Sequence, residues 1–581
     1  MNRVTGCALL CLLLAGCGGS DGGGGGTTGD IPVGNTGNGN GGGSGNGNGG
    51  GGGGGPVTDG PGTGADRLEP LDNTLASAWT QAGAARAEAV PSAATGRGAA
   101  RNVILFVGDG MGIGTETAAR ILDGQNRGES GEENVLSFEA MPFAGLSRTY
   151  NVDAQTADSA GTMTAMMTGV KTDAGVINVA ERVERGECGS VPFNELVSAL
   201  QLAELGGLAT GVVSTARLTH ATPAATYAIS AERNWEDISD MPAKAIEAGC
   251  EDIASQFVAF EQRLEARYPG ADVDGIEIAM GGGRRHFLPA DARFNTPDAF
   301  SPVEGDRTDG RHLMDEWRAL YPNGTLAIDQ AGFDGYDPES GERLLGLFNE
   351  SHMQYAELRG EDVSGEPSLA EMTDVALRRL DNDPDGYFLV VEAGRIDHAH
   401  HANSSRGALL DTIALAEAVA VARAAASDNT LIIVTADHSH VFTMAGHPVR
   451  GNPILGLVRE PGESAPSLAA DGLPYTTLAY RNGPGFRDLG AGVDPDVIYG
   501  TGPAVGGRQD LSSVDTASSG YHHEVLVPLT SETHGGEDVA IHAQGPGAPL
   551  LQGTNEQNMI FHVMEHAADL GGRAEAVLGT P

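Results

Sequence analysis

The stretch V-V-E-A-G-R-I-D-H-A-H-H-A-N, residues 390–403, decides how the rest of the chain is interpreted. It belongs to an apolar run typical of a strand buried on both faces, and that run ends at the carboxylate Glu392. Asp397 and His401 are four residues apart, so on a helical turn their side chains lie on one face. Because such a pair makes half of a zinc site, the stretch predicts metal binding past a strand end. The alternative is a chance polar cluster on a surface helix.

Two more apolar runs of strand length also lead into carboxylates. Residues 102–107 precede Asp109 in a glycine-rich turn, and residues 431–435 precede Asp437. Because parallel strands bring their carboxyl ends to one edge of a sheet, where α/β proteins bind ligands, we expect both to converge with Glu392. Mixed histidine and carboxylate sites suit zinc, whereas all-oxygen sites suit magnesium. A single aspartate in a glycine-rich turn is more often a helix cap.

Strand-like runs alternate with helical patterns along most of the chain, which is typical of a parallel sheet. A helix over 194–205 precedes a strand over 209–214, and an alanine-rich helix covers 412–426. Residues 446–528 are instead rich in glycine and proline, with short strand-like pieces. We therefore predict an α/β fold: a three-layer α/β/α sandwich with a mostly parallel central sheet and an inserted subdomain at about 446–528.

Ser159 and Arg233 are candidates for phosphoryl chemistry. Ser159 stands at the start of a predicted helix, where free N–H groups and the helix dipole favour an anion and help to ionise a hydroxyl. The alternative is that Asp158 or Ser159 only caps that helix. The planar guanidinium of Arg233 suits two oxygens of one phosphoryl group, with a surface ion pair as the alternative. With the ligand candidates, these residues form a plausible catalytic set.

The N-terminal residues predict export. Residues 1–16 contain Arg3 and a short apolar run, well below the roughly 20 residues that a membrane span needs. The sequence Leu14-Ala15-Gly16-Cys17 resembles the lipobox of bacterial lipoproteins, which implies cleavage before Cys17 and acylation of this cysteine. An ordinary signal peptide is the alternative. We therefore expect a lipid-anchored protein at a bacterial membrane: the outer membrane, the periplasmic face or the cell surface.

Residues 17–66 predict a flexible tether. Within 18–64, 26 of 47 residues are glycine, so this stretch has too little apolar surface to fold. Residues 67–581 then form the expected catalytic domain. The formal charge of −43 argues against nucleic-acid binding and against electrostatic attachment to anionic lipid, so contact with the membrane is expected through the lipid alone. In an exported domain, Cys188 and Cys250 predict one disulfide, or else two buried thiols.

As a set, the motifs resemble those of the alkaline phosphatase family. They occur in the family order from about Asn102 to the C-terminus, and the set is far more specific than any one piece. The matching pieces are Asp109-Gly110-Met111-Gly112, Asp158-Ser159-Ala160, Thr222-Pro223-Ala224, residues 391–398, Thr435-Ala436-Asp437-His438 and Glu532-Thr533-His534-Gly535-Gly536.

The resemblance implies hydrolysis of phosphate monoesters at alkaline pH by a homodimer that associates through the inserted, or crown, region. It implies that Ser159 forms a phosphoserine intermediate and that Arg233 holds two non-bridging phosphate oxygens. It also implies two Zn²⁺ and one Mg²⁺, with three ligand sets: Asp397, His401 and His534 for one zinc, Asp109, Asp437 and His438 for the other, and Asp109, Thr222 and Glu392 for magnesium.

Asp158, His220 and His398 are expected beside these ligands. Some bacterial members have Asp and Lys where this chain has His220 and His398, whereas animal-type members have two histidines. The animal-type pattern also resembles Arg233-Asn234-Trp235 and implies a Cys188–Cys250 disulfide. We therefore predict looser magnesium binding. Animal-type enzymes also carry a calcium site, but His352 stands where a carboxylate ligand is expected, which argues against that site here.

Two other functions remain as alternatives. The first is a phosphodiesterase or sulfatase on the same two-zinc scaffold. Arg233 and Thr222 argue against it, since the diesterase relatives lack this clamp and the third metal site. The second is a tethered metal-binding surface protein without catalysis, from which Ser159 distinguishes an enzyme.

Overall fold

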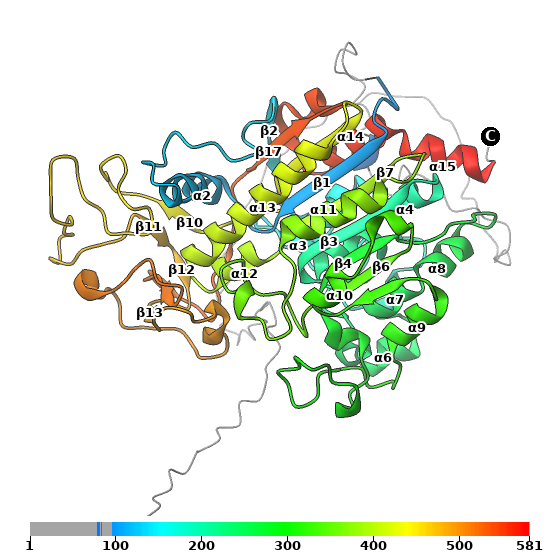
Figure 1. The fold of residues 1–581 in the computed structure, drawn as a ribbon, viewed down its shortest axis with the longest axis horizontal. Helices are drawn as coiled ribbons and strands as arrows, with labels where there is room; N and C mark the ends of the chain where they lie inside the picture. Colours follow the sequence, from blue (N-terminus) through cyan, green and yellow to red (C-terminus); the bar gives the residue numbers. More distant parts are fainter. Residues whose placement is uncertain (1–77, 82, 84–95, 580–581) are drawn as a thin grey trace, which may run out of the picture.

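The computed structural model describes residues 78–81, 83 and 96–579 (Figure 1). The predicted signal over 1–16 and the acylated Cys17 with its tether over 17–66 lie outside the described residues, so those expectations stay predictions. Among the helices of the described ranges, none combines the length and the hydropathy needed to cross a membrane.

A ten-stranded sheet forms the centre of the described chain. All neighbouring strands are parallel except at β17, which runs antiparallel to both of its neighbours. In spatial order the strands are β18 (Gly553–Glu556), β2 (Phe143–Arg148), β17 (Val539–Gln544), β8 (Thr430–Ala436), β1 (Asn102–Gly108), β7 (Tyr387–Ala393), β3 (Ala209–Arg217), β4 (Ile278–Gly282), β6 (Leu344–Leu347) and β5 (Thr325–Ala327).

The sheet separates two hydrophobic cores. Along β1, Val103, Leu105 and Val107 point into one core, and Ile104 and Phe106 point into the other. The central strands are therefore apolar at nearly every position, as expected for strands covered on both faces. This arrangement confirms the predicted three-layer α/β/α sandwich.

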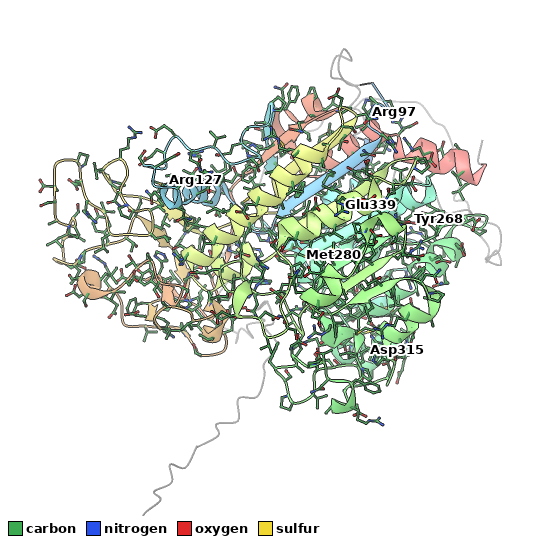
Figure 2. All side chains as sticks on the ribbon, in the orientation of Figure 1. Arg97, Arg127, Tyr268, Met280, Asp315 and Glu339 are labelled. Atoms are coloured by element: carbon green, nitrogen blue, oxygen red, sulfur yellow. A yellow bond between two sulfur atoms is a disulfide. The ribbon has the colours of Figure 1, made fainter. Side chains whose placement is uncertain are left out.

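Helices cover both faces of the sheet, and Figure 1 shows α11 and α13 crossing in front of it. The helices of the first core are α3 (Ser159–Thr168), α4 (Ala199–Leu205), α5 (Ala221–Tyr227), α7 (Ile253–Val258), α8 (Phe260–Arg267), α9 (Leu313–Leu320), α14 (Met559–Ala568) and α15 (Leu570–Leu578). Those of the second are α2 (Ile113–Asn126), α10 (Gln330–Asp334), α11 (Leu369–Leu380), α12 (Arg395–His401) and α13 (Ser405–Ala425). In Figure 2, Met280 on β4 is buried, whereas Arg127 and Asp315 lie at the surface.

Some element boundaries differ from those predicted. The helix predicted over 194–205 begins only at Ala199, because Ser198 caps it and exchanges side-chain and backbone hydrogen bonds with Gln201. The helix predicted over 412–426 is longer and begins at Ser405. Strand β18 and the two C-terminal helices were not predicted.

Residues 446–528, called the inserted segment below, lie beside the sheet at the left of Figure 1. The segment and the strands next to it form short two-stranded ladders. They are β10 (Phe442–Met444) with β11 (Leu478–Tyr480), β12 (Asn482–Gly483) with β15 (Val527–Pro528), and β13 (Arg487–Asp488) with β14 (Tyr521–His522). The role of this segment in dimer formation stays a prediction.

Candidate metal centre and nucleophile

The three strand-end carboxylates lie at one edge of the sheet. Strand β1 pairs with both β7 and β8, so Asp109, Glu392 and Asp437 come from three adjacent strands. Each of the three side chains is fully buried. The sheet topology therefore places three acidic groups together in the interior.

Several oxygens of these buried carboxylates have no hydrogen-bond donor among the described residues. Both oxygens of Asp109, Glu392 Oε1 and Asp437 Oδ2 are buried without a hydrogen-bond partner in the described chain. Burial, followed by the neighbouring Asp437, Asp397 and Glu392, raises the pKa of Asp109 well above its usual range. Because buried anions are stable only when they are paired, protonated or bound to metal, this donor set fits cations.

Asp397, His401 and His534 form the first candidate group. His401 Nε2 lies 3.3 Å from Asp397 Oδ2, and His534 Nε2 lies 3.4 Å from Asp397 Oδ1. The two imidazole Nε2 atoms are 3.2 Å apart. Each Nδ1 donates to a backbone carbonyl, at 2.6 Å to Glu532 and 2.7 Å to Ala157. Because Nδ1 donates to a carbonyl, Nε2 is the atom through which each ring would bind zinc.

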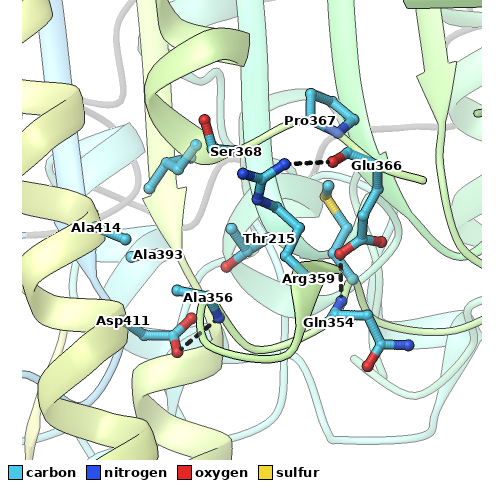
Figure 3. Close-up of a pocket in the computed structure, with 12 residues that line it drawn as sticks. Thr215, Gln354, Ala356, Arg359, Glu366, Pro367, Ser368, Ala393, Asp411 and Ala414 are labelled. Atoms are coloured by element: carbon cyan, nitrogen blue, oxygen red, sulfur yellow. Dashed lines mark hydrogen bonds between the residues drawn. The ribbon is translucent and has the colours of Figure 1, made fainter. Parts of the chain in front are cut away.

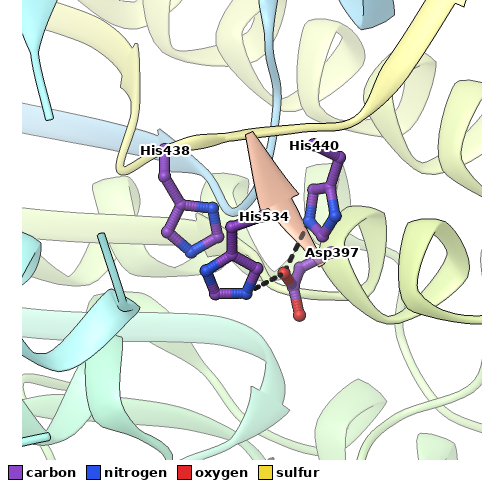
Figure 4. Close-up of side chains that lie close together, drawn as sticks. All are labelled: Asp397, His438, His440 and His534. Carbon is purple, nitrogen blue, oxygen red and sulfur yellow. Dashed lines mark hydrogen bonds and ion pairs between the residues drawn. The ribbon is translucent and has the colours of Figure 1, made fainter. Parts of the chain in front are cut away.

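Asp109, Asp437 and His438 form the second group, whose donor atoms lie within 4.8 Å of one another. His438 Nε2 is 3.2 Å from Asp437 Oδ2 and 3.6 Å from Asp109 Oδ1. Burial and then the neighbouring His534 lower the pKa of His438 well below its usual range, so the ring is neutral. The His438 and His534 rings stack with centroids 3.6 Å apart, which makes the first two groups direct neighbours (Figure 4).

The third group joins Asp109 and Glu392 on the sheet to α5. Asp109, Glu392 and His220 offer donor atoms within 4.8 Å of one another. Burial raises the pKa of Glu392 to about 7, although a hydrogen bond from Ser214 lowers it. Two carboxylates and a hydroxyl are the oxygen donors that magnesium prefers. Asp109 thus takes part in both the second and the third group.

Ser159 and Asp158 take different roles at the start of α3. Asp158 is the N-cap residue, and its Oδ1 accepts from Gly161 N at 3.1 Å. Ser159 is the first helical residue, and its Oγ lies 3.2 Å from His438 Nε2. The capping alternative therefore describes Asp158, while the Ser159 hydroxyl faces the second ion group.

Arg233 is buried, so the alternative of a surface ion pair does not hold. Its Nη1 lies 3.2 Å from Asp158 Oδ2, and its Nη2 lies 3.2 Å from His220 Nε2. Three residues further on, Glu236 accepts from Arg217 at 2.6–3.1 Å and from Thr219 at 2.6 Å. These hydrogen bonds connect the loop that carries Arg233 to the end of β3.

His398 lies beside two further histidines rather than beside carboxylates. Its Nδ1 is 3.2 Å from Arg395 Nη1, and its ring centroid is 4.0 Å from that of His352 and 5.6 Å from that of His220. His352 Nδ1 accepts from Arg217 N at 3.2 Å. Burial, together with nearby arginines, lowers the pKa of both His352 and His398 well below the usual range. Both rings are therefore neutral.

The sequence did not predict a role for two residues of the cluster, His440 and Glu532. His440 Nε2 lies 2.7 Å from Asp397 Oδ1 (Figure 4). Its Nδ1 lies 2.5 Å from Glu532 Oε2. Burial lowers the pKa of His440, but Glu532 and Asp397 raise it to about 10. The available signal was spacing, since His440 stands two residues after His438 and Glu532 two before His534.

A disulfide joins Cys188 to Cys250, which is the predicted pairing. Both cysteines pack against a small apolar cluster, separate from the two main cores, that includes Val183 and Trp235. Trp235 is two residues from Arg233, so the disulfide supports the same loop.

A separate cavity of about 30 Å³ is lined by none of the predicted site residues (Figure 3). Two buried carboxyl groups line it. Burial and Asp362 raise the pKa of Glu366 to about 8, and burial raises that of Asp411 to about 7. Backbone N–H groups of Gln354 and Ala356 donate to these carboxyl groups. The cavity is therefore distinct from the ion groups at the sheet edge.

A helix-terminal serine hydroxyl, a buried guanidinium and clustered candidate ligands at the edge of a mostly parallel sheet are the features of metal-dependent phosphoryl hydrolases. The alkaline phosphatase family model matches residues 100–570. The chain belongs to the alkaline phosphatase family, and it is an enzyme that hydrolyses phosphate monoesters. This result favours the monoesterase over the diesterase, sulfatase and non-catalytic alternatives.

Relatives and solved structures agree with this placement. The chain is 41% identical over 477 residues to the human tissue-nonspecific alkaline phosphatase isozyme, covering 81% of this chain and 84% of that one. It is 41% identical over 479 residues to an alkaline phosphatase of Gadus morhua, covering 81% and 92%. The alkaline phosphatase of Thermus thermophilus superposes with a TM-score of 0.56 at 22% identity, covering 83% and 96%. At that identity the superposition shows the fold alone.

Proposed function

We propose that this enzyme transfers the phosphoryl group of diverse monoesters to Ser159 and then to water, at alkaline pH, with two Zn²⁺ and one Mg²⁺. The observation that carries the proposal is the position of Ser159: its Oγ lies 3.2 Å from His438 Nε2 at the start of α3. Arg233 Nη1 lies 3.2 Å from Asp158 Oδ2, and Asp158 is the residue before Ser159. The serine therefore lies close both to the guanidinium and to the candidate ligand His438.

The donor chemistry supports the expected ions. Asp397, His401 and His534 would hold one zinc. Asp109, Asp437 and His438 would hold the other, and Asp109, Thr222 and Glu392 would hold magnesium; the buried oxygens without partners and the oriented Nε2 atoms fit these assignments. When bound, such cations lower the pKa of a hydroxyl and neutralise charge that develops on phosphoryl and leaving-group oxygens.

Ser159 would provide the nucleophile. Its Oγ loses a proton to solvent, attacks phosphorus and forms a P–O bond, while the ester P–O bond breaks and the leaving oxygen takes up a proton to give the alcohol. Water then attacks phosphorus, which releases inorganic phosphate and returns the Ser159 hydroxyl. Free backbone N–H groups at the start of α3 favour the negative charge at this position. Asp158 instead fixes the surroundings of the serine, because its carboxylate accepts from Gly161 N, Gly175 N and Arg233.

Arg233 would orient the phosphoryl group. Its two terminal nitrogens end in the buried site next to Asp158 and His220. A planar guanidinium donates two parallel hydrogen bonds to two non-bridging oxygens, and such preorganised donors are most effective where water is excluded. Asp158 and His220 then fix the plane of the guanidinium before substrate binds.

His220 and His398 support the proposal of loose magnesium binding. Some bacterial relatives place a carboxylate at the first of these positions, whereas an imidazole adds no negative charge near the third group. We expect mild chelation to remove magnesium first and to reduce activity, and added magnesium to restore it. Full activity after chelation, without any response to magnesium, would count against this part of the proposal.

The enzyme is further proposed to be an exported lipoprotein anchored through Cys17 and a homodimer formed by the inserted segment. Exposed apolar side chains of that segment, among them Val505 and Leu526, support a role in association. Mass spectrometry of the N-terminus and release of a Cys17→Ala variant from membranes test the anchor. Analytical ultracentrifugation of the chain with and without Leu526→Glu tests the dimer.

Ser159→Ala is the central test. It should leave the metal content unchanged and reduce monoester turnover by at least roughly a thousandfold, because the nucleophile is lost. Acid quenching with a ³²P-labelled monoester should trap label on Ser159 in the wild type only. A wild type that prefers a diester, or one that turns over substrate without labelled serine, would refute the proposed mechanism.

A further inference from the structure

We propose that the inserted segment shapes the ion group of Asp397, His401 and His534, and that Tyr480, Asp496 and Tyr499 are the positioning residues through which it acts. This inference rests on the proposed function, since it concerns how one of the proposed zinc sites is held.

Helix α12, which carries Asp397 and His401, cannot fix its own orientation. It has only seven residues, and its N-cap Gly394 provides no side-chain hydrogen bond. Helices this short gain their stability from packing rather than from propensity. Ile396 and Ala399 anchor the apolar side of α12 in the second core. The polar side, from which the ligands project, needs other anchors.

Asp496 holds the first turn of α12. It belongs to η7 (Pro495–Ile498) of the inserted segment, and its Oδ2 lies 2.8 Å from Arg395 Nη2. Its other oxygen accepts from Tyr355 at 2.6 Å, and the Arg395 guanidinium lies 3.7 Å above the Tyr355 ring centroid. Arg395 is buried and Asp496 only partly exposed, and this charge-assisted hydrogen bond restrains the start of the helix.

Tyr499 holds the middle of the helix. Its hydroxyl donates to the backbone carbonyl of His398 at 2.7 Å. His398 lies between Asp397 and His401 in sequence, so this bond acts on the backbone that joins the two ligands.

Tyr480 holds the last turn and reaches the ligand Asp397 through two rings. Its hydroxyl lies 2.7 Å from His400 Nδ1, and the opposite nitrogen of His400 lies 3.0 Å from Thr115 Oγ1. The His400 ring stacks on His440 with centroids 4.8 Å apart. His440 in turn hydrogen bonds to Asp397. A change at Tyr480 is therefore transmitted to the carboxylate.

The end of α12 is fixed in the same way. Asn403 has a φ of 56°, and its side chain donates to Asn482 O at 3.0 Å and accepts from Gly485 N at 3.0 Å. The inserted segment thus contacts the helix at its start, middle and end. Contacts along the whole of α12 indicate that the inserted segment fixes the position and orientation of this helix. Docking of the segment against the rest of the protein would need only one of these contacts.

The second ion group is held differently. Asp437 Oδ1 accepts from Gly110 N at 2.9 Å and from His438 N at 2.8 Å, both on the turns that follow β1 and β8. These restraints come from the sheet. Loosening the inserted segment should therefore weaken one ion site and spare the other.

The test is zinc release from the full-length Tyr480→Phe/Tyr499→Phe variant, followed with a chromogenic chelator. We expect one of the two zinc ions to leave about tenfold faster than in the wild type, and the second to leave at the wild-type rate. Tyr475→Phe is the matched control, because this partly buried tyrosine of the same segment bonds through its backbone to Val458. Excess zinc should restore full occupancy.

Cobalt substitution identifies the ion that is lost. After brief chelation, the cobalt absorption spectrum of the double variant should match that of His401→Ala and differ from that of His438→Ala. Equal loss of both ions, or wild-type release of both, would overturn this inference alone, because the wild type still holds zinc. A wild type that binds no zinc would overturn the proposed function together with the inference.

Discussion

The two zinc groups proposed here share an edge of the sheet, but they are built by different means. The strand-end group uses Asp109 and Asp437, each placed by one residue of chain beyond a buried strand. The helix group uses Asp397 and His401 on a short helix and His534 on β16 (His534–Gly535), and it depends on side chains from remote segments. One group is set by backbone hydrogen bonds of the sheet, the other by packing and polar contacts. The first should therefore tolerate changes around it better than the second.

The largest expected effect comes from removing the residue that the second and third groups share. Asp109→Asn takes one carboxylate from both, so zinc and magnesium contents should fall together. Activity should drop by at least roughly a thousandfold, since charge neutralisation by cations dominates this chemistry. Metal analysis beside a monoesterase assay checks the result. Loss of magnesium with zinc unchanged would show that the two groups do not share this residue.

A smaller and more local effect is expected at the helix group. His440→Gln removes the imidazole that bonds to Asp397 and Glu532. Zinc affinity at this group should weaken by roughly 10–100-fold while the strand-end group keeps its ion. Competitive chelation of the two sites measures both affinities. Equal weakening at both sites would remove the distinction drawn between them.

The position of Arg233, like that of the helix group, depends on side-chain contacts. The variant Glu236→Gln tests this dependence. The change weakens the hydrogen bonds that residue 236 accepts from Arg217 and Thr219. The KM for substrate and the inhibition constant for inorganic phosphate should both rise about tenfold, with a smaller change in kcat.

Glu232→Gln is the control for this prediction, because Glu232 lies on the same loop but pairs with Arg185 near the surface. A fall in kcat with KM unchanged would place Glu236 outside the positioning of Arg233.

The smallest effect concerns stability without metal. Glu392 is an acid whose pKa in the folded protein is raised from 4.5 to about 7. The folded state therefore binds more protons than the unfolded state between these values, and stability falls as pH rises through this window. The melting temperature of chelated enzyme should drop by a few degrees from pH 5 to pH 7. Glu392→Gln should flatten the slope, and an unchanged slope would contradict the assignment.

The difference between the strand-end group and the helix group also explains which site residues the sequence could predict. The positions of Asp109, Glu392 and Asp437 can be predicted from the local sequence, because each residue comes at or just beyond the end of an apolar run of strand length. The roles of His440 and Glu532 do not follow, since the two residues are 92 positions apart and meet only in the folded chain. The start of α4 was missed because the cap at Ser198 outweighed the helical pattern before it.

The pairing of β16 with β9 (Ser439–His440) completes the proposed helix group from the C-terminal part of the chain. The ladder sets His534 opposite His440, and His534 follows every other proposed ligand in the sequence. A nascent polypeptide that has formed β1, β7 and β8 already gathers three acidic groups, yet it lacks the histidine that closes the helix group. A chain that ends before residue 534 would therefore lack one ligand of the proposed helix group.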